Sequence, residues 1–237
     1  MTAILETRTG KAGSIELRAK ADGAGTLFGY AITYGNHSRN LGGFVEQVAP
    51  GAVDNSLRDQ VRVMARYNHD NAYLLGTTDA GTLRLESDDF GLLYDIDLPD
   101  TNAGRDVHAL AARGDLKFSS FAFYALDEEW SLTAEDFLLR TITQLHLVDV
   151  APVNDPAYLD TTTGLRAVDS PSFPAVRAAM QSLAERTGLD LDALSSTPVE
   201  EIRARISGEP PPSPAQRATH VGERLSVRRR RLELAKL

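Results

Sequence analysis

Short runs in which apolar and polar residues alternate fill the chain from about Thr26 to about Pro156. Such runs, broken by Gly, Asp and Asn, are typical of strands that bury one face. We expect strands at 26–34, 44–48, 61–67, 82–86, 91–98, 117–124 and 138–150. The segment SDDFG at 87–91 has the Asp pair and the Gly of a hairpin loop between two of these strands. The pattern therefore predicts a mostly β domain.

The last of these strands carries an acidic residue in an apolar setting. Leu145, Leu147 and Asp149 occupy alternate positions, so we expect them to share one face of the strand. A buried carboxylate is costly unless it is paired. The sequence therefore predicts a cationic or hydrogen-bonding partner for Asp149.

One helix is expected within the β region, in TNAGRDVHALAARGD. Thr101 or Asn102 can serve as the N-cap, Val107 and Leu110 lie on one apolar stripe, and Gly114 suits a left-handed C-terminal position. The helix leads directly into the predicted strand 117–124.

After Pro156 the spacing of apolar residues becomes helical. A helix is predicted over 173–186 with Gly188 as its end, and a second over 198–206 that ends at Gly208. The second has a capping box formed by Thr197 as N-cap, Pro198 and Glu200. The segment PPPSP at 210–214 predicts a stiff linker, and a basic helix or tail follows it.

Charge divides the chain at about the same place. Residues 1–159 contain 23 Asp and Glu against 13 Lys and Arg, whereas residues 160–237 contain 10 against 12. We therefore expect an acidic domain over 1–159 and a helical appendage over 160–237. Clustered cations are needed to neutralise phosphates, so the acidic domain is not expected to bind nucleic acid. The run Arg228 to Arg231 is typical of a solvated helix end or tail, or else of a contact for an acidic partner.

Composition narrows the remaining classes. With 42% hydrophobic and 24% charged residues, the chain resembles ordinary globular proteins and not fibrous or wholly disordered ones. It has no run of 18 apolar residues and no signal-like apolar segment near residue 1, so we expect a cytoplasmic protein without a membrane span. The absence of cysteine excludes disulfides, a thiol nucleophile and thiolate metal sites.

The five histidines are spread singly, and neither an HExxH motif nor a Gly-rich phosphate loop is present, so we expect no metal and no cofactor. What remains is an oxygen nucleophile with a histidine base and an orienting carboxylate. His69 follows a strand, Ser119 and Ser120 lie within KFSSFAFY, and Asp149 is the buried acid. Each also has a structural explanation: a solvated turn histidine, a small filler in a core strand, and a structural ion pair. Spacing alone does not decide between these explanations.

Four segments, in order, resemble the prohead (procapsid maturation) proteases of tailed bacteriophages, which are serine proteases with a fold similar to that of the herpesvirus assemblins. They are GYAITYGNHSRNLGGFVEQVAPGAVDNSL at 29–57, NHDNAYLLGTT with GTLRLESDDFGLLYDIDLPDT at 68–101, RGDLKFSSFAF at 113–123 and LHLVDVAPVNDPAY at 145–158. The resemblance extends over residues 26–158.

This resemblance implies roles for three residues. His69 would be the general base, Ser120 the nucleophile and Asp149 the third member of a Ser-His-Asp triad. The chain departs from the family pattern in having Ala122 where Gly is usual and Asp-Val-Ala for Glu-Val-Ser at 149–151. His146 stays open as an alternative third member, as in the Ser-His-His enzymes of herpesviruses.

The resemblance also implies a fold and a function. The fold would be α+β, a mostly antiparallel, barrel-like protease domain with flanking helices and the helical appendage. The enzyme would cleave scaffold protein or major capsid protein, and itself or another copy, inside the procapsid in the host bacterial cytoplasm. The rival hypotheses are a catalytically silent internal scaffold of the same fold and a generic β binding module.

Overall fold

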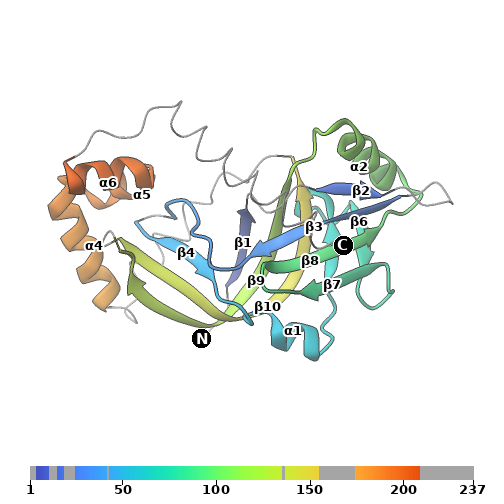
Figure 1. Ribbon diagram of the computed structural model, residues 1–237, viewed down its shortest axis with the longest axis horizontal. Helices are drawn as coiled ribbons and strands as arrows, with labels where there is room; N and C mark the ends of the chain where they lie inside the picture. Colours follow the sequence, from blue (N-terminus) through green and yellow to red (C-terminus); the bar gives the residue numbers. More distant parts are fainter. Residues whose placement is uncertain are drawn as a thin grey trace.

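The computed structural model describes residues 4–10, 15–18, 25–41, 43–134, 137–154 and 174–208. Within these residues the strands form two sheets (Figure 1). The larger sheet has the order β1 (Leu5–Gly10), β9 (Phe118–Leu132), β10 (Leu138–Val153), β5 (Met64–Arg66), β6 (Leu74–Thr77), and β4 (Val45–Val48) also pairs with β10. The smaller sheet has the order β2 (Glu16–Arg18), β3 (Thr26–Thr33), β8 (Gly91–Asp97), β7 (Leu83–Ser87).

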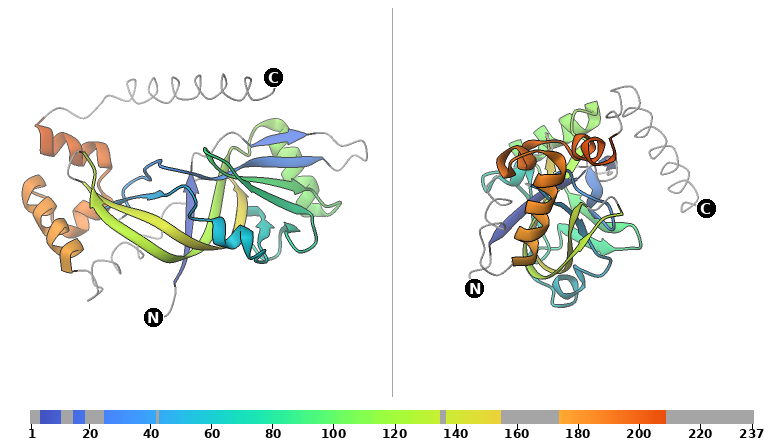
Figure 2. Two further views of the ribbon diagram at one scale, coloured as in Figure 1. Left: turned by 60° about the horizontal axis from the view of Figure 1, so that its bottom comes forward. Right: turned by 90° about the vertical axis from the view of Figure 1, so that its left-hand side faces the viewer.

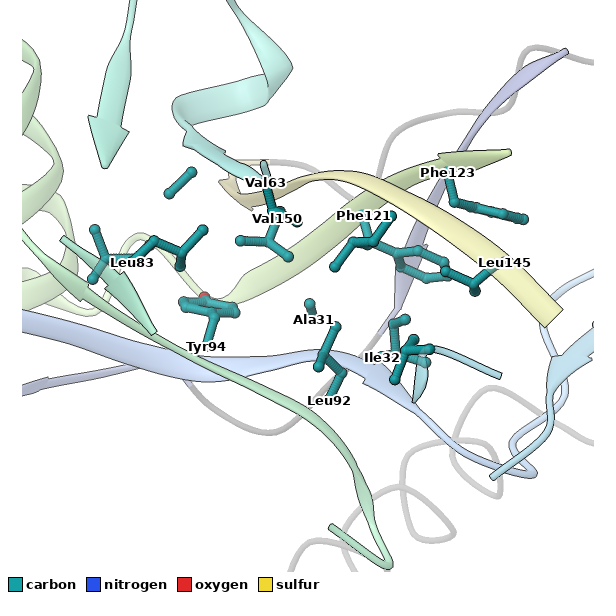
Figure 3. Close-up of a cluster of buried hydrophobic side chains, with 14 of the residues drawn as sticks. Ala31, Ile32, Val63, Leu83, Leu92, Tyr94, Phe121, Phe123, Leu145 and Val150 are labelled. Atoms are coloured by element: carbon teal, nitrogen blue, oxygen red, sulfur yellow. The ribbon is translucent and has the colours of Figure 1, made fainter. Parts of the chain in front are cut away.

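The expectation of a mostly antiparallel α+β fold is confirmed, but the expected barrel needs correction. Every strand pair of the described residues is antiparallel except β10 with β4 and β10 with β5. The two sheets do not close into one barrel in the described part of the chain. They enclose a core to which β3 and β8 contribute Ile32 and Tyr94, and β9 and β10 contribute Phe121 and Val150 (Figure 3).

All seven predicted strands are present, and the differences are three unpredicted edge strands and a longer β9. The strands β1, β2 and β6 were not predicted because each is short and lacks a clear apolar alternation. Strand β9 continues to Leu132 through ALDEEWSL, a charged stretch that pairs with β10 as a long hairpin. Pairing with a neighbouring strand, rather than burial of one face, determines the conformation of these segments.

The predicted helix inside the β region is confirmed as α2 (Asn102–Arg113). Thr101 is its N-cap and accepts a hydrogen bond from the Gly104 amide, and Gly114 ends it with a φ of 78°. The sequence did not predict the short helix α1 (Asp54–Arg58). Its Ser56 hydroxyl donates to the Leu145 carbonyl and accepts from the Leu147 amide, and so fixes the helix to β10.

Three helices lie beyond the tip of the β9–β10 hairpin (Figures 1 and 2). They are α4 (Pro174–Thr187), α5 (Leu191–Ser196) and α6 (Val199–Ser207), and none of the described helices is long and apolar enough to span a membrane. Leu183, Leu194 and Ile202 of these helices form a buried cluster with residues of β4 and β10. The Asn40 amide donates to the carbonyls of Leu194 and Thr197.

The expected ends of the C-terminal helices are only partly right. Gly188 and Gly208 follow α4 and α6 with φ of 67° and 73°, as predicted. The capping box is wrong, because Pro198 is the N-cap of α6 and makes no side-chain cap. Thr197 instead ends α5 and donates its hydroxyl to the Ala193 carbonyl. The predicted linker at 210–214 and the basic tail lie outside the described residues.

Candidate active site

Three adjacent strands position the three residues that the sequence singled out. Ser120 lies near the start of β9, Asp149 lies near the end of β10, and His69 ends the 3-10 turn η1 (Tyr67–His69) that directly follows β5. Strand β10 is the middle strand, antiparallel to β9 and parallel to β5. This arrangement brings together side chains that are up to 80 residues apart in the sequence.

The three side chains form a continuous chain of hydrogen bonds. His69 Nε2 lies 2.6 Å from Ser120 Oγ, and His69 Nδ1 lies 2.7 Å from Asp149 Oδ1. Asp149 is 1% exposed and Ser120 is fully buried, whereas the His69 side chain is 20% exposed. The buried carboxylate thus fixes the ring through one nitrogen and leaves the other nitrogen facing the hydroxyl.

A β-bulge, which the sequence did not predict, determines the face on which Asp149 lies. Leu147 is opposite Phe123, but Asp149 is opposite Ala122, with a register shift between the two pairs. Directly opposite residues share a face, so Asp149 lies on the face of Ala122 and Leu147 on the core face. The expectation that Asp149 shares a face with Leu145 and Leu147 is therefore wrong. The bulge turns Asp149 out of the apolar core, onto the face that carries Ser120.

Backbone conformation brings His69 to this face. Asn68 and His69 both have left-handed conformations, with φ of 54° and 60°. Such conformations cost about 1–2 kcal/mol each for residues other than Gly, with Asn the best tolerated. The turn is fixed on both sides, because Asn68 Oδ1 accepts from the Asn154 amide and the Tyr67 hydroxyl donates to Asn154 Oδ1. Strain of this kind is common where a functional side chain must be aimed.

Asp149 has the partners that its burial led us to expect: Arg66 is the cation, and His69 is a hydrogen-bonding partner. Arg66 Nη1 donates to Asp149 Oδ2 over 3.0 Å, and its side chain is 15% exposed. Arg66 is the last residue of β5, which pairs with β10 in parallel at Asp149. Arg66 was not named from the sequence, although an arginine three residues before the motif histidine on a predicted strand was the available signal.

The two neighbouring serines point to opposite faces of β9. Ser119 lies on the core side, where its hydroxyl is 2.8 Å from the Tyr94 hydroxyl. Burial raises the pKa of the Tyr94 phenol above its usual value, so this phenol remains a neutral hydrogen-bonding partner. Ser119 is thus part of the packing between the sheets, and only Ser120 contacts His69.

The remaining sequence candidates lie elsewhere or line the site. His146 lies opposite Tyr124 on β10, with 6.2 Å between the ring centroids, while Asp149 is the partner of His69. Ala122 and Ala151, which depart from the family pattern as Asp149 itself does, lie opposite Asp149 and Ser120, respectively. No cluster of three or more potential metal ligands occurs among the described residues.

Comparison with known proteins identifies the family. The sequence pattern of the caudovirus prohead serine proteases matches residues 13–172, more than half of the chain. The chain belongs to that family. The prohead protease match includes His69, Ser120 and Asp149, and it supports a serine protease of phage capsid maturation.

Two further comparisons contribute less to the identification of the family. A search among curated proteins gave no match. Among solved structures, the chain is similar to the capsid assembly protease gp21 of bacteriophage T4, at 10% identity and a TM-score of 0.46. That likeness covers 63% of this chain and 96% of the T4 chain.

Proposed function

We propose that this prohead protease is an endopeptidase that uses Ser120 as nucleophile, His69 as general base and Asp149 as the carboxylate that orients the histidine. The observation that carries the proposal is the unbroken chain of hydrogen bonds from Asp149 through His69 to Ser120. A catalytically silent scaffold would have no need of a buried carboxylate and a strained turn aimed at one serine hydroxyl.

The geometry supports the following mechanism. Asp149 accepts from His69 Nδ1, which leaves Nε2 free to take the proton of Ser120. The Ser120 oxygen attacks a peptide carbonyl carbon, and the tetrahedral intermediate collapses when His69 gives the proton to the leaving amine. A water molecule then attacks the acyl-enzyme, with His69 again as the general base, and Ser120 is released. The negative charge of Asp149 stabilises the imidazolium that forms in both steps.

We further propose that the substrates are the scaffold or major capsid protein, and the protease itself, within the procapsid in the host cytoplasm. This part rests on membership of the family. A protein that acts there would meet its substrates at high local concentration, so it needs no tight binding to them.

Replacing each of the two neighbouring serines tests the proposal. Ser120→Ala is expected to abolish the reaction with a tagged fluorophosphonate and the shortening of a co-expressed major capsid protein of the same phage. Ser119→Ala is the matched control: it should keep both reactions and lose about 1–3 kcal/mol of stability, because Tyr94 loses a buried partner.

Both variants are compared at a temperature where circular dichroism shows them folded, and labelling and mass are read by mass spectrometry. If Ser120→Ala still reacts, or if Ser119→Ala is the inactive protein, the assignment of the nucleophile is wrong.

A further inference from the structure

Strand β1 closes the edge of β9 next to Ser120 (Figure 1). It pairs with β9 in antiparallel register, with Thr9 opposite Ser120 and Arg8 opposite Phe121. The other edge of β9 is taken by β10. A peptide that adds to β9 directly alongside Ser120 can therefore do so only in the place of β1.

The same strand encloses the hydroxyl of Ser120. Ser120 is fully buried, and its Oγ lies 2.9 Å from the carbonyl oxygen of Arg8 as well as 2.6 Å from His69 Nε2. One hydroxyl proton cannot serve both acceptors fully, so the Arg8 carbonyl competes with His69 for it. With β1 in place, the nucleophile is covered and only partly coupled to its base.

Charges and backbone pairing, not apolar packing, hold β1 in place. Among its described side chains, Glu6 is buried and Arg8 nearly so, whereas Leu5 is 50% exposed and no β1 side chain belongs to the buried hydrophobic clusters. Glu6 accepts from Arg140 at 2.7 and 3.0 Å. Opening of β1 therefore breaks ion pairs and backbone hydrogen bonds but removes no side chain of β1 from the hydrophobic core.

The contact of Arg8 indicates which kind of side chain fits at this edge. Arg8 Nε and Nη2 donate to the two carboxylate oxygens of Glu46 at 2.8 and 3.0 Å. This bidentate geometry matches a guanidinium group. Glu46 lies on β4 and is 3% exposed. When β1 leaves, this buried carboxylate loses one of its two cations and keeps Arg140.

We propose that β1 occupies the place of the substrate: an extended peptide replaces it at the edge of β9, with a basic side chain held by Glu46 where Arg8 lies. This inference rests on the proposed function of Ser120. It makes β1 an internal competitor and Glu46 a residue that determines specificity.

A reversible cross-link between β1 and β9 tests the inference. The chain has no cysteine, so Thr7→Cys with Ala122→Cys creates a single pair at positions directly opposite each other. In the probe reaction with a tagged fluorophosphonate, Ser120 Oγ attacks phosphorus, fluoride leaves and His69 takes the proton. The oxidised protein should react at least about tenfold more slowly than the same protein after reduction, because local opening of β1 is blocked.

The control is a cross-link that leaves β1 free. Glu129→Cys with Thr141→Cys joins opposite positions of β9 and β10 far along the hairpin, and its oxidised and reduced forms should react alike. Equal rates for the two forms of the β1 pair would overturn the inference and leave the proposed function intact. If no form reacts, including wild type, the proposed function itself fails.

A second measurement addresses Glu46. Two peptidyl diphenyl phosphonates that differ only in having Arg or Glu at the residue next to phosphorus are compared on the wild-type protein. The arginine probe should label Ser120 at least about tenfold faster than the glutamate probe. Equal labelling, faster labelling by the glutamate probe, or labelling by neither while the fluorophosphonate reacts would overturn the specificity assigned to Glu46.

Discussion

Asp149→Asn is the most informative change at the site, because it keeps the volume of the side chain and removes one acceptor. In the native protein, one carboxylate oxygen accepts from His69 and the other from Arg66. Asparagine has a single oxygen for these two partners. Arg66 can only donate, so the amide oxygen should turn toward Arg66 and the amide nitrogen toward His69.

The result is the wrong tautomer of the histidine. With an N–H group facing it, His69 Nδ1 must accept, and the ring proton moves to Nε2, which then cannot take the proton of Ser120. In a Ser-His-Asp triad of another protein this defect lowers kcat about 10⁴-fold. We expect a loss of the same order here, which corresponds to about 5 kcal/mol in the activation barrier.

The assay is the second-order rate constant for reaction with the fluorophosphonate, with thermal unfolding to confirm that each variant is folded. Nitrogen-15 NMR of the His69 ring reports the tautomer directly. Because Arg66 is expected to orient the side-chain amide in Asp149→Asn, removal of the Arg66 guanidinium provides a control. The double variant Arg66→Met, Asp149→Asn should react at least about tenfold faster than Asp149→Asn alone, because its amide oxygen is free to face His69.

Either of two results would refute the reasoning. An Asp149→Asn protein within about threefold of the wild-type rate would show that the carboxylate is structural. A double variant no faster than Asp149→Asn would show that Arg66 does not control the orientation of residue 149.

Two predictions concern stability. Burial alone would raise the pKa of the Glu6 carboxyl, but the hydrogen bond and the charge of Arg140 outweigh burial and lower it. Ionised Glu6 therefore stabilises the fold at pH values above the ordinary carboxyl pKa. This stabilisation is lost as the pH falls through the lowered pKa. The unfolding temperatures of wild type and Glu6→Gln should therefore differ at pH 7 and converge at acid pH; a constant difference would contradict this. A fragment of residues 1–166 should be less soluble and less stable to heat than the full chain, since removal of the helices exposes the buried Val45 and Phe137. A fragment as stable as the full chain, and still labelled at its serine, would support a separable appendage.

Local signals in the sequence were sufficient for much of the fold. The aromatic alternation around Ser120 indicated a strand, the residues that flank α2 marked both of its ends, and SDDFG marked the hairpin, where Asp88 Oδ1 caps the amides of Phe90 and Gly91. These features depend on neighbours in the chain, so one sequence suffices to predict them.

The features that were missed depend on distant partners. The bulge before Asp149 exists because β10 must fit the register of β9, and strict alternation therefore put the carboxylate on the wrong face. Thr197 looked like an N-cap, but its hydroxyl bonds back to Ala193 at the end of the preceding helix. Strand β1 has no apolar pattern, because backbone pairs with β9 and the ion pairs of Arg8 with Glu46 and of Glu6 with Arg140 attach it to the sheet. The division of the chain at residue 160 stays a prediction.

The geometry of the site depends on the core behind it. Ser119 and Phe121 flank Ser120 on β9, Val150 follows Asp149 on β10, and these three neighbours face the second sheet. Phe121 and Val150 are seen in the core in Figure 3. The positions of Ser120 and Asp149 are thus set by buried side chains on the opposite face of the same two strands. The same two strands run on to the hairpin whose far end packs against α4, α5 and α6. The strand pair β9–β10 therefore joins the Ser120 site to the C-terminal helices. A loss of packing at either end of this pair changes the support of the same two strands.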